Sequence, residues 1–177
     1  MNIFIVAIDH GLQLKREPTD SPQLTAQKEQ LEALLRREIP KRKVQFISEE
    51  SDLQKTTIAR ALAKETNPQI PWINIKMNDK ERTAAGIKEA LAKRPGHPDY
   101  LTMTFWIESR IPEDLARESF FIDQTLQAAK GAESILMLLG DLHVDAVAKR
   151  LTEMGHRVET NHDLFPVRRW EERPNIP

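Results

Sequence analysis

Residues 135–143, with the sequence ILMLLGDLH, decide the fold of this chain. The five consecutive apolar residues at 135–139 are typical of a strand buried on both faces, as in a parallel sheet. Gly140 ends the run, and apolar residues from Val144 to Met154 then recur at helical spacing. The sequence therefore predicts a strand that turns tightly into a helix, with His143 at the turn. In open α/β sheets such turns lie at the carboxyl edge, where ligands bind.

The N-terminal residues 3–10, IFIVAIDH, repeat this arrangement in a shorter form. In both segments an apolar run ends in a small residue, Ala7 or Gly140, and a histidine follows three positions later. A single loop histidine is commonly a solvated side chain. Two histidines at matching strand ends indicate a site, so we expect His10 and His143 to share one edge of the sheet.

The rest of the chain alternates between strand and helix patterns. The order predicts a single α/β domain over residues 1–160, followed by an Arg- and Pro-rich tail at 161–177. Its sheet is expected to be mostly parallel, with about five strands and helices on both faces. Residues 96–111 fit either an extra strand or an aromatic flap over the active edge. The predicted strands are 2–8, 44–48, 71–75, 135–139 and 156–160, and the predicted helices are 24–39 (ended by Pro40), 53–64, 79–93, 112–130 and 141–154.

The composition limits the classes of function. The chain has 177 residues, a net charge of −1 and no cysteine. This charge argues against a basic surface for nucleic acid, and the lack of cysteine excludes disulfides, zinc–thiolate sites and thiol nucleophiles. The apolar runs are too short to cross a membrane, and no basic region precedes the first one. We therefore expect a cytoplasmic protein without a membrane partner.

Two glutamates follow the predicted strand at 44–48. Glu49 is the first residue past this strand and is preferred over Glu50. If the strands are parallel, either carboxylate shares an edge with His10 and His143. Two imidazoles and a carboxylate can bind a divalent metal such as Mn²⁺, Zn²⁺ or Co²⁺, and the same groups can perform acid–base chemistry on water without a metal. An ordinary acidic pair at a helix start is the alternative.

Other charged residues near these strand ends are further candidates. Asp141 either caps the following helix or supports His143. Asp79 and Arg82 open the helix after the third strand, either as an exposed, capped helix start or as part of the site. Arg117 lies in the middle of a helix, where ordinary ion pairs within the helix are the common alternative.

Four short motifs together resemble the TraB/Tiki and ChaN/erythromycin-esterase-like superfamily. They are Ala7-Ile8-Asp9-His10, Ile47-Ser48-Glu49-Glu50, Arg117-Glu118-Ser119-Phe120-Phe121 and Gly140-Asp141-Leu142-His143. Within that superfamily the chain resembles a small group of single-domain bacterial proteins of uncharacterised activity, in which the segment at 79–87 also recurs. The resemblance covers most of residues 1–160. It departs at Ala7, where the first motif usually has glycine.

The resemblance implies hydrolytic chemistry. Tiki-like members are metal-dependent peptidases, erythromycin-esterase-like members are hydrolases thought to use a histidine base, and ChaN-like members bind haem iron. Carried over to this sequence, the catalytic and metal-binding centre becomes His10, Glu49 and His143. Arg117 becomes a contact to the substrate or to its oxyanion. The residues then expected to bind substrate are Glu50, Asp79, Arg82 and Asp141.

The leading expectation is thus a small hydrolase that acts on a small molecule or a peptide, with a homo-oligomer among its expected states. The alternative is a non-enzymatic module that binds a ligand or a partner on the same scaffold, as an accessory in a bacterial stress or defence locus. A third class is an oligomeric interaction protein that uses Phe165, Trp170 and the tail. A concave cleft over both histidines would favour the enzyme, and a large apolar contact at the tail would favour the oligomer.

Overall fold

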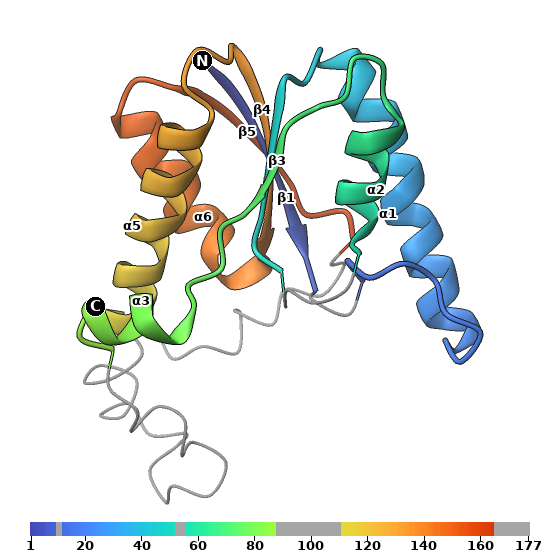
Figure 1. Ribbon diagram of the computed structural model, residues 1–177, viewed down its shortest axis with the longest axis horizontal. Helices are drawn as coiled ribbons and strands as arrows, with labels where there is room; N and C mark the ends of the chain where they lie inside the picture. Colours follow the sequence, from blue (N-terminus) through green and yellow to red (C-terminus); the bar gives the residue numbers. More distant parts are fainter. Residues whose placement is uncertain (10–11, 52–55, 88–110, 165–177) are drawn as a thin grey trace, which may run out of the picture.

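The fold is built on one sheet of five parallel strands (Figure 1). The computed structural model describes residues 1–9, 12–51, 56–87 and 111–164. The strand order is β3-β2-β4-β1-β5, which confirms the predicted α/β class with a parallel sheet. The strands are β1 (Asn2–Ile8), β2 (Phe46–Glu49), β3 (Trp72–Asn74), β4 (Ser134–Gly140) and β5 (Arg157–Asn161). The helices are α1 (Pro22–Lys41), α2 (Ile58–Glu65), α3 (Asp79–Ala84), α5 (Ile111–Ala128) and α6 (Asp141–Glu153).

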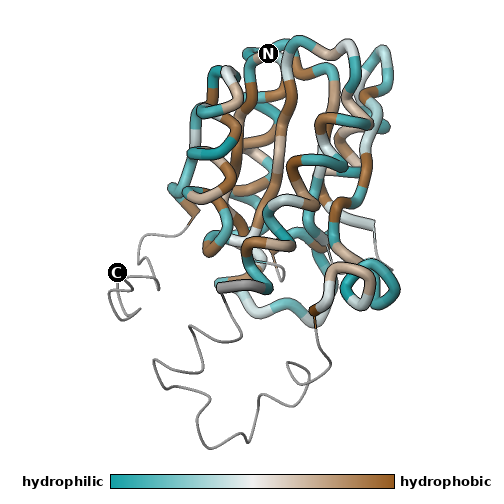
Figure 2. The backbone as a smooth tube through the Cα atoms, turned by 90° about the vertical axis from the view of Figure 1, so that its left-hand side faces the viewer, coloured by the Kyte–Doolittle hydropathy of each residue, from teal (hydrophilic) through white to brown (hydrophobic). Residues whose placement is uncertain are grey.

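Helices cover both faces of the sheet. Helices α1 and α2 lie on one face and α5 and α6 on the other (Figure 1). Strand β4 contributes side chains to the hydrophobic core on each face of the sheet. Leu136 and Leu138 point to α1 and α2, while Met137 and Leu139 point to the opposite face. All four side chains are fully buried, and each contributes about 1.5–3 kcal/mol of hydrophobic stabilisation. Figure 2 shows the hydrophobic residues gathered along the central strands.

The connections of β2 and β4 diverge at the carboxyl edge of the sheet. These strands are neighbours, but β2 continues through α2 to β3 on one side, whereas β4 continues through α6 to β5 on the other. The two helices also lie on opposite faces of the sheet. A crevice forms where adjacent strands send their connections in opposite directions, and ligands of open α/β sheets bind there. The fold therefore marks the ends of β2 and β4 as the place to look for a site.

Two predicted helix ends were wrong. Helix α1 does not stop before Pro40 but continues to Lys41, and its last turn is closed by the Arg42 N–H, which donates to the Glu38 carbonyl at 3.0 Å. Helix α3 stops at Ala84 rather than near residue 93. Gly86 adopts a left-handed φ of 73°, and the Ile87 N–H donates back to the Arg82 carbonyl at 3.0 Å. This is a Schellman closure, which needs a residue that tolerates positive φ.

Parts of the prediction fall outside the described residues. Most of the stretch at 96–111, predicted as an extra strand or a flap, belongs to the segment 88–110, and most of the tail belongs to 165–177. Strand β5 ends at Asn161, one residue past the predicted end of the domain. Within the described ranges, no helix is long and apolar enough to cross a membrane.

Candidate functional site

Glu50 directly follows the last residue of β2, next to the end of β4. Its side chain is fully buried, and its Oε2 accepts a hydrogen bond from the Gly140 N–H at 3.1 Å. Its Oε1 accepts from the guanidinium of Arg117 on α5. The Gln13 side-chain amide donates to the backbone carbonyl of Glu50 at 2.7 Å. One residue thus joins the ends of both strands to α5 and to the segment after β1, and it holds Arg117 at the carboxyl edge.

His143 and Glu118 form a buried pair beside this ion pair. His143 is in the first turn of α6, and its Nδ1 lies 3.2 Å from Oε1 of Glu118 on α5. Both residues are less than 5% exposed. The imidazole ring packs against the Phe121 ring in a T-shaped arrangement, with ring centroids 5.5 Å apart and planes at 80°. A carboxylate at Nδ1 fixes the ring and leaves Nε2 as the atom that can take or give a proton.

The face of α5 that packs on the sheet determines where Arg117 and Glu118 lie. The helical spacing of Leu115, Ser119, Ile122, Leu126 and Ala129 in the sequence predicts that these residues form the inner face of α5, but Leu115 is 52% exposed. The buried stripe instead passes through Glu118, Phe121, Ile122 and Thr125. Glu118 therefore faces His143. The sequence did not lead us to predict Glu118 as the partner of this histidine. The signal was present in the sequence, because a stripe centred on Phe121 and Ile122 places residue 118 one turn earlier on the same face.

Three cations, Arg82, Lys76 and Arg117, lie near two carboxylates, Glu113 and Glu50, on this side of the sheet. Arg82 on α3 donates to Glu113 on α5 at 2.9 Å, and the Glu113 side chain is buried. Lys76, just after β3, is half-buried, and this burial lowers the pKa of its ammonium. The negative charge of Glu50 opposes that shift in pKa, whereas Arg117 and Arg82 add to it. Lys76 and Glu113 were not among the predicted site residues.

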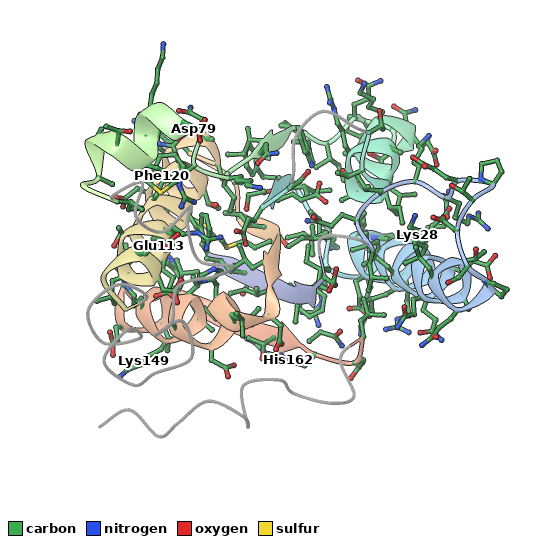
Figure 3. The ribbon with its side chains drawn as sticks, turned by 90° about the horizontal axis from the view of Figure 1, so that it is seen from below. Lys28, Asp79, Glu113, Phe120, Lys149 and His162 are labelled. Atoms are coloured by element: carbon green, nitrogen blue, oxygen red, sulfur yellow. The ribbon has the colours of Figure 1, made fainter. Side chains whose placement is uncertain are left out.

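Asp79 and Asp141 are two further predicted site residues. Figure 3 looks onto the carboxyl edge and shows Asp79 and Glu113 on the side of α3 and α5, with His162 at the end of β5. Asp79 is exposed at the first position of α3, where Asn78 and Glu81 form a capping box. Asp141 is not the cap of α6, because the capping residue is Gly140. The Asp141 carboxylate instead lies 2.9 Å from Nδ1 of His162.

Glu49 points away from His143. Its Oε2 accepts hydrogen bonds from the Thr57 hydroxyl at 2.7 Å and from the Trp72 indole N–H at 2.8 Å. Thr57 also caps the first turn of α2, and Trp72 packs on the core beneath α1 and α2. The carboxylate therefore lies on the opposite face of the sheet from the His143–Glu118 pair. The two predicted ligands Glu49 and His143 are not brought together.

His10 lies outside the described residues. Ile8, two positions before it, pairs with Gly140, three positions before His143. Among the described residues, no group of three or more His, Asp or Glu side chains has an arrangement that could hold a metal ion. The described part of the site is thus an acid–base pair, His143 and Glu118, beside a guanidinium that is held by Glu50. This set can move a proton at Nε2 and can bind negative charge through Arg117.

Comparison with protein-family models, with curated proteins and with solved structures finds no significant match.

Proposed function

We propose that this protein is a hydrolase that activates water with His143. The observation that carries the proposal is the buried His143–Glu118 pair next to the Glu50–Arg117 pair, at the crevice between β2 and β4. Arg117 and Glu118 are consecutive residues of α5, so one helix presents the partner of the base and the cation together. Such a combination of an oriented imidazole and a fixed cation suits acyl transfer to water.

In this mechanism, Glu118 accepts the Nδ1–H of His143 and fixes the tautomer with a basic Nε2. Nε2 takes a proton from water as the water oxygen bonds to the substrate carbonyl carbon. Arg117 stabilises the negative oxygen that develops, using donors beyond the one given to Glu50. The imidazolium then returns its proton to the leaving group as the bond to that group breaks, and the free base is restored.

The proposal includes a second version of the mechanism, in which a bound metal ion activates the water. Mn²⁺, Zn²⁺ or Co²⁺ would be bound through His143 and His10, as the resemblance to metal-dependent peptidases implies. Glu49 lies on the other face, so the carboxylate of this version would come from Glu50 or Glu118. The expected setting is a cytoplasmic enzyme acting on a small molecule or a peptide.

The test is the hydrolysis of p-nitrophenyl acetate by the full chain, with and without each metal. His143→Gln is expected to lower the rate by about 10²-fold to 10⁴-fold, the usual contribution of a general base. His156→Gln is the matched control, since His156 precedes β5 at the opposite edge of the sheet. Hydrolysis by the wild type that His143→Gln and His156→Gln affect equally would contradict the proposal.

A non-enzymatic binding module is the second candidate. It is favoured by the burial of His143, which is 3% exposed, and by the bridging of β2 and β4 by the Glu50 carboxylate. A module of this kind would show a metal-dependent rise in melting temperature that His143→Gln removes, without hydrolysis. A ligand at about one hundred times its dissociation constant adds about 2.7 kcal/mol to stability, which such a melt detects.

A further inference from the structure

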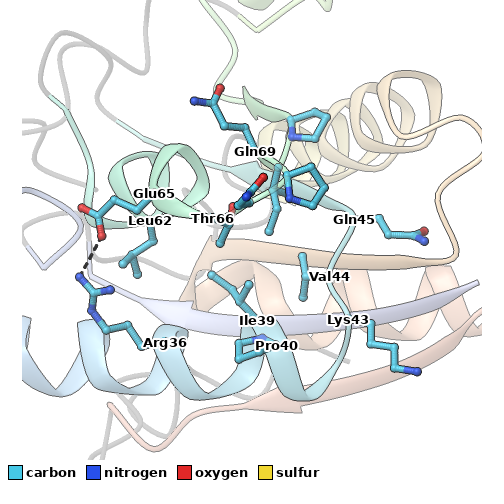
Figure 4. A pocket seen from close by; sticks show the side chains of 14 residues that line it. Arg36, Ile39, Pro40, Lys43, Val44, Gln45, Leu62, Glu65, Thr66 and Gln69 are labelled. Atoms are coloured by element: carbon cyan, nitrogen blue, oxygen red, sulfur yellow. Dashed lines mark hydrogen bonds and ion pairs between the residues drawn. The ribbon is translucent and has the colours of Figure 1, made fainter.

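A concave site lies at the amino edge of the sheet, away from the candidate active site. It is a cavity of about 640 Å³ between the C-terminal ends of α1 and α2, next to the residues that lead into β2 and β3 (Figure 4). This volume lies within the range of small-molecule pockets. His143 and Glu50 are at the carboxyl edge, so this cavity is separate from the proposed hydrolytic centre.

The interior of the cavity is apolar and rigid. Ile39, Val44 and Leu62 form its floor and are themselves part of the core under α1 and α2. The walls include three prolines, Pro40, Pro68 and Pro71. Proline has a fixed φ, so these walls lose little conformational freedom when a ligand binds. The cavity thus favours an apolar body that removes hydrocarbon surface from water.

The charges at the two ends of the cavity differ. At one end, Arg36 donates to Glu65 at 3.0 Å and also pairs with Glu32, so its charge is neutralised (Figure 4). At the other end Lys43 is exposed and adopts a left-handed φ of 51°. Within the described ranges, Lys43 makes no ion pair. The cavity therefore has an uncompensated positive charge at one end only.

We propose that this cavity binds an amphipathic monoanion, with its apolar body between α1 and α2 and its anionic group at Lys43. The charge at Lys43 favours an anion there, whereas Arg36 at the opposite end is already paired with Glu65 and Glu32. The proposal does not depend on the hydrolytic function, because the two sites share no residue.

The probes are octanoate, octan-1-ol and octylamine, which share one chain and differ in charge. Binding to the full chain is followed by ¹H–¹⁵N NMR, which locates each probe by the amides that shift. We expect octanoate to shift the amides of Val44, Gln45 and Ile70 and to bind more tightly than the other two probes. Lys43→Glu should weaken octanoate about fivefold, since it replaces a weak attraction by a similar repulsion, and should leave octan-1-ol unchanged.

Lys64→Glu is the matched control, because Lys64 is exposed on the last turn of α2 and does not line the cavity. It carries the same change of charge as Lys43→Glu and should leave octanoate binding unchanged. Equal affinities for the three probes, or equal effects of the two variants, would overturn the anion specificity. Shifts confined to amides elsewhere, or no shifts at all, would overturn the site itself.

Discussion

Glu49 and Glu50 are neighbours in the chain and both are fully buried, yet their surroundings differ. Glu49 faces α2 and accepts hydrogen bonds from two neutral donors, a hydroxyl and an indole N–H. Glu50 faces α5 and binds a guanidinium and a backbone N–H at the start of α6. The alternation of side chains along a strand sends consecutive residues to opposite faces, and here it separates two carboxylates of the same type.

This difference assigns different roles to the two faces of the carboxyl edge. On the Glu49 side, the carboxylate connects the start of α2 to β3, which fixes parts of the scaffold relative to one another. On the Glu50 side, charged groups from β2, α3 and α5 gather beside a histidine of α6. Titratable groups that cluster at a crevice are typical of functional sites. We therefore place the proposed hydrolytic site on the Glu50 side and expect a structural role for Glu49.

The largest expected effect on stability is that of Glu50→Ala. It leaves the mostly buried Arg117 and the Gly140 N–H without their partner, and breaking a buried ion pair costs about 3–5 kcal/mol. Urea unfolding measures this loss of unfolding free energy. Glu50→Gln should lose less, because its amide oxygen can still accept from Gly140. A loss no greater than that of Glu153→Ala, at an exposed position of α6, would contradict the buried pair.

Glu49→Ala should have a smaller effect. It removes the acceptor of two neutral donors but leaves no buried charge unpaired, so we expect a loss of about 1–3 kcal/mol in unfolding free energy. The indole N–H resonance of Trp72 should move because it loses its acceptor, whereas the resonances of His143 should stay. A shift of the His143 resonances in Glu49→Ala would show that the two faces are not independent.

A third buried carboxylate, Glu38, offers a reference away from the carboxyl edge. Burial alone would raise its pKa, but hydrogen bonds from Arg37 and Arg42 lower it from 4.5 to about 2. Its stabilisation should be fully present above pH 4.5 and should disappear as the pH falls to about 2. Glu38→Gln should therefore be less stable than the wild type by about 1–3 kcal/mol at neutral pH. In urea unfolding this gap should narrow in acid, and a gap that is independent of pH would contradict the pairing.

The smallest expected effect concerns Lys76. Burial lowers the pKa of Lys76 and Glu50 opposes this, so Glu50→Gln should lower that pKa further. Glu49→Gln should leave the pKa of Lys76 unchanged, because Glu49 lies on the other face. NMR titration of ¹³C-dimethylated lysines measures both variants. Equal shifts of the Lys76 pKa in the two variants would contradict the assignment of Lys76 to the Glu50 side.

Local patterns were sufficient to predict the fold class. The apolar run of β4 and the helical spacing after Gly140 indicate a buried parallel strand followed by a helix, as observed. Helix ends were less predictable. Pro40 fits within the last turn of α1, and Gly86 closes α3 early through hydrogen bonds that no periodicity shows.

The site was harder to predict because it depends on tertiary contacts. Glu49 and Glu50 can be told apart only by knowing which of them faces α5. A shift of one position along the strand would exchange the faces of the two side chains. The role of Glu118 depends on the rotation of α5, which Leu115 obscured. Position after a strand was enough to predict that Glu50 and His143 share one edge of the sheet, since the carboxyl ends of parallel strands meet there.

The most direct measurement is the ¹⁵N NMR tautomer of the His143 ring, recorded in the wild type and in Glu118→Gln. We predict that the neutral ring carries its proton on Nδ1, donated to Glu118, and keeps Nε2 free as the base. We also predict that Glu118→Gln weakens this preference, while the His156 ring is unaffected. A neutral His143 that carries its proton on Nε2 in the wild type would contradict the proposed water-activating base.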